Sequence, residues 1–302
     1  MDLLAAFHTF VRVAETGSFT AVAREAGLTQ PAVSRQVAAL EAHFGARLVQ
    51  RTTRSVALTE DGRDLLGHAR AVLEAVERAE GAVGRRQGGV SGMVRLSAPV
   101  VFGRVVIAPR IHSLLERHPG LSIDLMLDDR PMDLVHEGVD VAVRVGELPP
   151  DASFVARRIG TFSRLIVGSA AYLARHPEPL HPADLARHQC ILFDRAARPG
   201  VWTLSGPGGS MDVAVEGRFH TDSPEAGREA VLTGLGLAVL SAWLIRRELR
   251  DGTVRPVLQD WKLPLVPVHA VDPTQRNLAP RTRALIDFLV QEFRADPELF
   301  EM

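Results

Sequence analysis

Residues 16–58 read TGSFTAVAREAGLTQPAVSRQVAALEAHFGARLVQRTTRSVAL and predict two short helices, a tight turn and a basic hairpin. Ser18 is placed to cap the first helix, because a hydroxyl there accepts from an early backbone N–H. Gly27 ends it, since glycine adopts the left-handed conformation most easily. Thr29 is the next cap, and Pro31 is tolerated in the first turn that follows. This order predicts a winged helix-turn-helix, whose second helix enters a DNA major groove.

The second helix has two faces of different chemistry. Its apolar residues Val33, Val37 and Leu40 recur at spacings of four and three, which predicts burial. The opposite face carries Gln30, Ala32, Ser34, Arg35 and Gln36. Arginine and glutamine match guanine and adenine edges, and we expect Leu28 to fill the space between the two helices. Five arginines and two glutamates lie between residues 24 and 54, in a chain of net charge −1.

The pattern by itself leaves an alternative open. Helix pairs with a glycine turn also occur in all-α proteins, and Arg51 and Arg54 are equally compatible with a solvated loop. However, the stretch AETGSFTAVAREAGLTQPAVSRQVAALEAHFGARLVQRTTRSVALTEDG resembles the N-terminal domain of the LysR-type transcriptional regulators without a gap. The resemblance implies DNA-binding roles for the following residues: Ser18, Thr29, Gln30, Pro31, Ala32, Ser34, Arg35, Arg51 and Arg54.

Length and composition limit the class of protein. A chain of 302 residues predicts two or three domains, and 46% apolar residues are enough for their cores. The sequence lacks an apolar run of about 18 residues, so no membrane span is expected. The N-terminal MDLLAAFHTFVRVAETG lacks the features of a signal peptide, which predicts a cytoplasmic protein. The single cysteine, Cys190, lies in the apolar run HQCILF, which favours a buried core thiol over a redox sensor.

The segment after the hairpin predicts a long helix that starts at Thr59, with Glu60 and Asp61 near its positive end. Its apolar residues repeat in a heptad-like pattern at Leu65, Ala69, Val72, Val76, Ala79 and Val83. A helix packed on its own domain is the alternative. A helix of about 25 residues is too long for a 58-residue domain to cover. We therefore expect a dimerisation helix, and the resemblance implies the same.

The composition of residues 84–92, GRRQGGVSG, indicates a flexible connection. From residue 93 onward, short strands alternate with helices, which predicts a parallel sheet covered by helices. A strand in LPLVPVHAVDP is expected to return to the first half of this region, and ALIDFLVQEFRA is expected to form the last helix.

The phrases RLSAPVVFGRVVIAP, DLVHEGVDVAVRVG and AGREAVLTGLGLAVLS resemble the effector domain of LysR-type regulators. The resemblance implies an all-α winged helix-turn-helix with a linker helix, then a two-lobed α/β domain like a periplasmic binding protein. The expected divisions are 1–58 for DNA binding, 59–88 for the linker and 89–302 for effector binding. Lobe I is expected over 92–160 and 267–302, and lobe II over 161–266.

Ligands of open α/β sheets gather at the carboxyl ends of strands and near helix N-termini. This rule selects Ser97, Pro99, Val100, Phe102, Asp128, Asp129, Arg144, Trp202, Thr221, Asp222 and Ser223 as effector contacts. The family's pocket positions fall near Ser97, Asp128, Thr221 and Asp222. Alternatives remain: Ser97 as a helix cap, Asp129 and Arg144 paired with each other or with Arg130, and Trp202 as a core residue. Ser97 and Arg144 favour a small organic anion.

Other classes of function have weaker support. The segment Thr233–Gly236 is glycine-rich but does not follow a strand in a dinucleotide-binding pattern, and the eleven histidines lack metal-ligand spacing. A solute-binding protein would fit the C-terminal region but not the helix-turn-helix. We expect a non-enzymatic regulator with no metal or cofactor. Its expected partners are double-stranded promoter DNA, a second copy of itself in a dimer or tetramer, and a small effector. RNA polymerase is a further candidate, and no membrane partner is expected.

Overall fold

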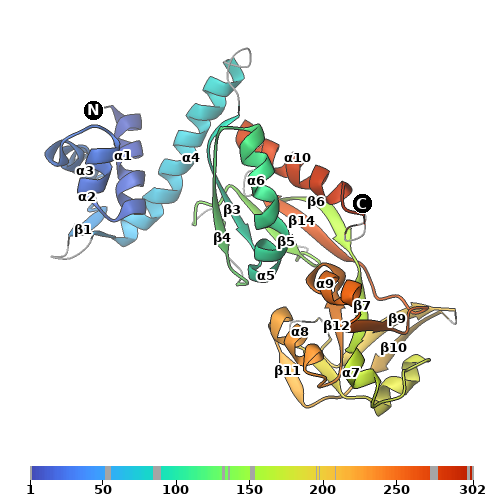
Figure 1. The fold of residues 1–302 in the computed structure, drawn as a ribbon. Coiled ribbons are helices and arrows are strands. Elements are labelled where there is room, and N and C mark those ends of the chain that lie inside the picture. Colours follow the sequence, from blue (N-terminus) through green and yellow to red (C-terminus); the bar gives the residue numbers. More distant parts are fainter. Residues whose placement is uncertain are drawn as a thin grey trace.

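The computed structural model describes residues 2–51, 56–83, 90–130, 133–134, 137–149, 154–194, 196, 198–207, 209–272, 278–297 and 300. Figure 1 shows a helical N-terminal domain joined by the long helix α4 to a first lobe, with a second lobe beyond it.

The N-terminal domain contains three helices and a hairpin. They are α1 (Leu3–Thr16), α2 (Phe19–Glu25), α3 (Gln30–Phe44), β1 (Val49–Arg51) and β2 (Val56–Leu58). The Ser18 hydroxyl accepts from the Ala21 N–H over 3.2 Å, which confirms the predicted cap of α2. Gly27 has φ +65°, as expected for the residue that ends this helix. Leu28 is exposed rather than packed between the helices, because α1 supplies Phe7 and Phe10 to the core instead.

Helix α4 (Glu60–Val83) follows the hairpin directly. The Thr59 hydroxyl accepts from the Gly62 N–H over 3.0 Å, which confirms the predicted cap. At 1.5 Å per residue the 24-residue helix is about 36 Å long. Its residues up to Leu73 pack on the N-terminal domain, through Leu65, Leu66, Ala69 and Leu73.

Lobe I is built on a five-stranded sheet of order β4-β3-β5-β14-β6. Its strands are β3 (Ser91–Ala98), β4 (Gly120–Leu127), β5 (Val141–Val145), β6 (Val155–Phe162) and β14 (Val266–Asp272). Its helical segments are α5 (Val100–Phe102), the π-helical η1 (Gly103–Ile107), α6 (Ala108–Arg117) and α10 (Pro280–Arg294). The helix expected in PMDLVHEG lies partly outside the described residues.

Lobe II contains a second five-stranded sheet of order β11-β8-β12-β7-β13 and a separate β9–β10 hairpin. Its strands are β7 (Arg164–Ser169), β8 (Cys190–Phe193), β9 (Val201–Gly206), β10 (Gly209–Ala214), β11 (Phe219–Thr221), β12 (Leu237–Ser241) and β13 (Val254–Val257). Its helical segments are α7 (Ala170–Leu173), η2 (Pro182–Arg187), α8 (Pro224–Leu232), η3 (Ala242–Leu244) and α9 (Arg246–Asp251).

The expectation of parallel sheets is wrong in part. Strand β3 runs parallel to both β4 and β5, but β14 is antiparallel to β5 and β6. In lobe II, β7 is antiparallel to β12 and β13. The reason is that the chain crosses between the lobes twice. It leaves lobe I after β6, enters lobe II as β7 and returns to lobe I as β14. The strands β7 and β14 therefore run opposite to their neighbours. The predicted return strand is thereby confirmed.

Candidate nucleic-acid interface and ligand cleft

Helix α3 presents most of the polar face that its sequence predicts. Gln36 is the exception, because it is half-buried and its amide oxygen accepts from the Thr9 hydroxyl of α1 over 2.5 Å. Val33, Val37 and Leu40 are at most 1% exposed and anchor the helix in the core. Gln30, Pro31 and Arg35 are exposed on the outside, with Ala32 and Ser34 half-buried beside them. A rigid helix therefore offers an amide and a guanidinium within its first two turns, at the end that enters a major groove in this type of motif.

The two predicted cap residues differ in what their side chains do. Ser18 caps α2 with its hydroxyl, so that group is already engaged in the fold. Thr29 occupies the N-cap position of α3, but its side chain makes no capping hydrogen bond. Its hydroxyl is exposed at the start of the helix, where a phosphate oxygen is a suitable partner.

The wing is attached to α3 by a carboxylate. Glu41 Oε1 accepts from the backbone N–H groups of Leu48 and Val49 over 2.9 and 3.3 Å. The strands pair antiparallel, with Arg51 opposite Val56. Arg51 ends β1, its side chain is outside the described residues, and Arg54 at the tip lies outside them altogether.

The predicted dimerisation residues separate into two groups. Ala69 is fully buried and Leu65 is half-buried, both against the N-terminal domain of their own chain. Ala69 is thus not accessible to a second copy, because α1 covers the first half of α4. Farther along, Val72 and Ala79 are exposed and Val76 is half-buried. The side chain of Val83 lies outside the described residues.

The lobe I side of the cleft brings several predicted residues together. Ser97 is the second-last residue of β3 and is fully buried. Its hydroxyl accepts from Arg144 Nη1 over 3.3 Å. The same nitrogen donates to the Val143 carbonyl over 3.2 Å. Burial lowers the pKa of Arg144, and the charge of Asp128 opposes that shift. Among the described residues Arg144 forms no ion pair within 4.0 Å, so it is a half-buried cation supported mainly by neutral groups.

Two alternatives for this region can now be decided. Ser97 does not cap the following helix, because the cap position belongs to Pro99. The carboxylate of Asp129 accepts from the Val100 N–H over 3.1 Å, so it occupies the helix start itself. Pro99 and Val100 are half-buried beside it.

On the lobe II side the hydroxyls are engaged in local turns. The Thr221 hydroxyl accepts from the Ser223 N–H over 3.0 Å, and the Ser223 hydroxyl caps α8 through the Ala226 N–H. Asp222 is exposed between them. Arg104, four residues after Val100, forms an ion pair with Glu225, so the first turns of α5–η1 and α8 face each other across the lobes.

Two predicted effector contacts are core residues instead. Trp202 is 8% exposed and packs in the lobe II core beneath the β9–β10 hairpin, with Leu185 and Leu204. Phe102 is 2% exposed and meets Trp243 edge to face, with ring centroids 5.4 Å apart. Phe102 does follow β3, but Trp202 is the second residue of β9 and not beyond its carboxyl end, and both large apolar side chains turn into the cores.

A cavity of about 860 Å³ lies between the lobes, at a place that the strand-end rule does not select. Its lining includes Arg104, Glu225, Arg228, Trp243 and Arg246, and none of the predicted effector residues. The α9 residues RRELRD supply much of its charge. In the sequence, the cluster of arginines in RRELRD is the feature that could have indicated this cavity.

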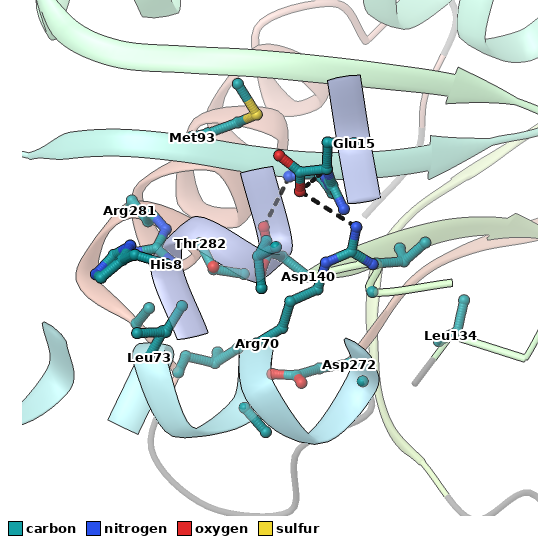
Figure 2. Close-up of a pocket in the computed structure, with 18 of the residues that line it drawn as sticks. His8, Glu15, Arg70, Leu73, Met93, Leu134, Asp140, Asp272, Arg281 and Thr282 are labelled. Atoms are coloured by element: carbon teal, nitrogen blue, oxygen red, sulfur yellow. Dashed lines mark hydrogen bonds and ion pairs between the residues drawn. The ribbon is translucent and has the colours of Figure 1, made fainter. Parts of the chain in front are cut away.

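A second cavity, of about 310 Å³, lies between α1, α4 and lobe I. Figure 2 shows Glu15 and Arg70 pointing toward each other in this cavity, with Asp140 and Asp272 nearby. Within the described residues there is no cluster of three or more metal-ligating side chains, and no helix is long and apolar enough to cross a membrane.

Comparison with known protein families gives two matches. Residues 4–63 match the family described as bacterial regulatory helix-turn-helix protein, lysR family. Residues 87–294 match the LysR substrate binding domain. Together they include the helix-turn-helix, the first residues of α4 and both lobes.

Whole-chain relatives agree. An HTH-type transcriptional regulator of Xanthomonas campestris pv. campestris is 35% identical over 96% of this chain and 85% of its own length. The HTH-type transcriptional regulator PtxR of Pseudomonas aeruginosa is 34% identical over 96% of this chain and 93% of its own. Among solved structures, CrgA, a LysR-type transcriptional regulator from Neisseria meningitidis, covers 95% of this chain and 98% of its own, with 29% identity and a TM-score of 0.61.

Proposed function

The chain belongs to the LysR family of bacterial transcriptional regulators, and we propose that it reads DNA with the exposed face of α3 and senses a small carboxylate at Arg144. It is a DNA-binding transcriptional regulator with an effector-binding domain. We divide it into a DNA-binding domain (1–58), a linker (59–88) and an effector domain (89–302), with lobe II over about 161–266.

For DNA recognition we assign base contacts to Gln30 and Arg35, with Pro31, Ala32 and Ser34 beside them. Thr29, Ser18, Arg51 and Arg54 are assigned to the phosphates next to these bases. The observation that supports this assignment is the contrast on α3 between fully buried Val33 and Leu40 and exposed Gln30 and Arg35. A mobility-shift titration on DNA from the region upstream of the gene tests it. The affinity should fall steeply with salt because counterions are released, and a weak salt dependence would contradict it.

For assembly we propose that a second copy packs along Val72, Val76, Ala79 and Val83. The earlier residues of the same apolar series, Leu65 and Ala69, pack on the chain's own N-terminal domain. Two-fold pairing would place two α3 helices about one DNA turn apart, on an inverted repeat. Sedimentation of Val76→Glu tests this: the variant should dissociate at concentrations where the unchanged protein is dimeric or tetrameric.

For the effector we propose a small organic anion whose carboxylate pairs with Arg144. The supporting observation is that, within the described part of the chain, this half-buried guanidinium donates to two neutral oxygens, those of the Ser97 hydroxyl and the Val143 carbonyl. Asp128 and Asp129 favour a ligand that also carries a hydrogen-bond donor, because their carboxylates accept. Thr221, Asp222 and Ser223 would close the cleft from lobe II.

Calorimetric screening of the full-length protein with a panel of small mono- and dicarboxylates tests the effector site. Arg144→Gln should abolish binding of any acid that the unchanged protein takes, and Ser97→Ala should weaken it. Asp287→Asn, far from the cleft on α10, serves as the control. Unchanged affinity in both cleft variants would show that the site lies elsewhere.

Control of transcription would follow from differential binding. A ligand shifts an equilibrium between assembly geometries only if it binds one of them more tightly. We propose that lobe closure changes the angle between paired DNA-binding domains, and hence the DNA bend and contact with RNA polymerase. Footprints that are identical with and without effector would contradict this mechanism. The activity proposed is binding rather than catalysis.

A further inference from the structure

Glu15, at the end of α1, is bonded to three arginines from three different elements. Its carboxylate accepts from Arg12 Nη1 over 2.6 Å and from Arg70 Nη2 over 3.2 Å, and it also pairs with Arg95. Arg12 is on the same helix, whereas Arg70 comes from α4 and Arg95 from β3 of lobe I. We call these four residues the Glu15 cluster. One carboxylate therefore connects the DNA-binding domain directly to the effector domain of the same chain.

The cluster is shielded from water. The side chains of Glu15, Arg70 and Arg95 are 16%, 18% and 15% exposed. Burial lowers the pKa of Arg70, the charge of Arg95 lowers it further, and Glu15 opposes both effects. The two guanidiniums thus repel each other, and the carboxylate between them compensates. Without Glu15 the counter-charges left to these two arginines would all lie on lobe I, with Asp124 at 3.5 Å from Arg95 and Asp140 near Arg70, so neither would connect to the DNA-binding domain.

Arg70 is also fitted to the loop that precedes β5. Its Nη1 donates to the Glu137 carbonyl over 3.3 Å. A Cβ added to Gly138 would lie 2.1 Å from that nitrogen, and Gly138 has φ +63°. Only glycine allows the guanidinium to approach the backbone this closely. The contact therefore depends on both partners: α4 supplies the Arg70 guanidinium, and lobe I supplies the Glu137 carbonyl and the space beside Gly138.

The strands that hold the cluster also carry the proposed carboxylate site. Arg95 and Ser97 lie on one face of β3, about 7 Å apart, because side chains alternate along a strand. The Arg95 N–H donates to Asp140 Oδ2 over 2.7 Å, just before β5 begins. Ser97 pairs with Ala142, and Arg144 follows two residues later on β5. A movement of β3 relative to β5 near Ser97 and Arg144 would therefore also displace Arg95 and Asp140 at the other end of the strand pair.

From this geometry we infer that Glu15 is a positioning residue for DNA recognition. Through Arg95 and Arg70 it fixes the orientation of the DNA-binding domain on lobe I. A shift of β3 and β5 caused at Ser97 and Arg144 then reaches α3 within one chain, without passing through a subunit interface. The last step rests on the proposed carboxylate site, whereas the positioning role of Glu15 does not.

Orientation has a measurable consequence in a two-fold assembly. The distance between paired α3 helices sets the half-site spacing that is bound best. Duplexes selected from a random pool by the full-length protein provide the reference operator, and one base pair is then added or removed between its half-sites. The readout is the ratio of affinities for the selected and altered spacings.

Glu15→Gln and Arg95→Gln should each reduce this ratio about fivefold, a size typical of directly coupled residues. Arg12→Gln is the matched control: it removes a bond to Glu15 inside the DNA-binding domain and should leave the ratio unchanged. Arg95→Lys keeps the charge and should restore part of the preference. Circular dichroism spectra and melting temperatures above the assay temperature show that folding is intact, since loss of the shielded counter-charge lowers the melting temperature by itself. An unchanged ratio in both Glu15→Gln and Arg95→Gln overturns the inference.

A double-mutant cycle separates positioning from the link to the cleft. Arg144→Gln should change the spacing ratio, and its effect should be smaller when Arg95→Gln is already present. Additive effects would overturn the strand route. Loss of carboxylate binding in Arg144→Gln with an unchanged spacing ratio would also overturn it, while leaving the effector site itself in place.

Discussion

Nη1 of Arg246, on α9 of lobe II, lies 3.1 Å from Oδ2 of Asp296, which follows α10 of lobe I. The same oxygen accepts from Arg110 Nη2 over 2.9 Å. Asp296 is therefore a mostly buried link between the two lobes, close to the junction where Trp243 packs on Phe102 and Phe162.

Replacing this link should destabilise the effector domain. Asp296→Asn removes the carboxylate that Arg110 and Arg246 share, while Arg110 keeps Glu292 at 4.0 Å, and we expect a loss of about 1–2 kcal/mol in the free energy of unfolding. Asp287→Asn removes the exposed pair with Arg157 and should cost less than about 0.5 kcal/mol. Urea titrations of the full-length variants compare the two. Equal losses would show that Asp296 acts only as another surface charge.

Arg35→Ala should relax base preference. If Arg35 reads a guanine edge, the variant loses about 1–3 kcal/mol of discrimination at one base pair and keeps the other preferences. His43→Ala, exposed near the opposite end of α3, should keep them all. Competition binding with single-base substitutions measures this. Uniform weakening on every duplex would instead assign Arg35 to a phosphate.

Trp202 should matter for stability and not for ligand affinity. Trp202→Ala creates a cavity beneath the β9–β10 hairpin and should cost about 3–5 kcal/mol. Trp202→Phe keeps most of the apolar volume and should cost less. Calorimetry with a bound carboxylate provides the second readout. A changed affinity in the stable Trp202→Phe variant would return Trp202 to the effector site.

Cys190 should remain unreactive over the physiological pH range. Burial raises the pKa of its thiol to about 12 from an ordinary value of 9.0. Because the folded pKa is raised, this thiol contributes stability that is fully present below pH 9 and is lost as the pH rises through 12. Ellman's reagent should react slowly at pH 8 with the folded protein and rapidly after denaturation. Rapid reaction in the folded state would favour the redox alternative.

Gly138→Ala should displace Arg70 from lobe I. The new methyl group would overlap the guanidinium, and φ +63° disfavours any residue with a Cβ. We expect a loss of about 1–3 kcal/mol from the strained backbone and the lost hydrogen bond. Thermal unfolding measures the loss, with Gly45→Ala as a control that has a similar φ of +67° but open space around the Cβ. If both variants lose the same amount, Arg70 is not involved.

Local spacing in the sequence is sufficient to predict the N-terminal domain. The hydroxyl of Ser18, the glycine at 27 and the apolar series at 33, 37 and 40 act within one or two helical turns, and the structure confirms each. The strand-end rule is less reliable. It selects Ser97 and Arg144, which do meet, but also Phe102 and Trp202, because it ignores which way a side chain turns.

The sequence by itself determined the recognition helix, because its caps and apolar spacing depend on residues close along the chain. The resemblance of its motifs to a known family implied the two-lobed plan. Only the tertiary structure decided that Ala69 packs on its own domain and that Glu15 meets Arg70 and Arg95. Those residues lie 55 and 80 positions from Glu15. An ion pair depends on distances of a few ångströms, and these are fixed only when separate elements have docked.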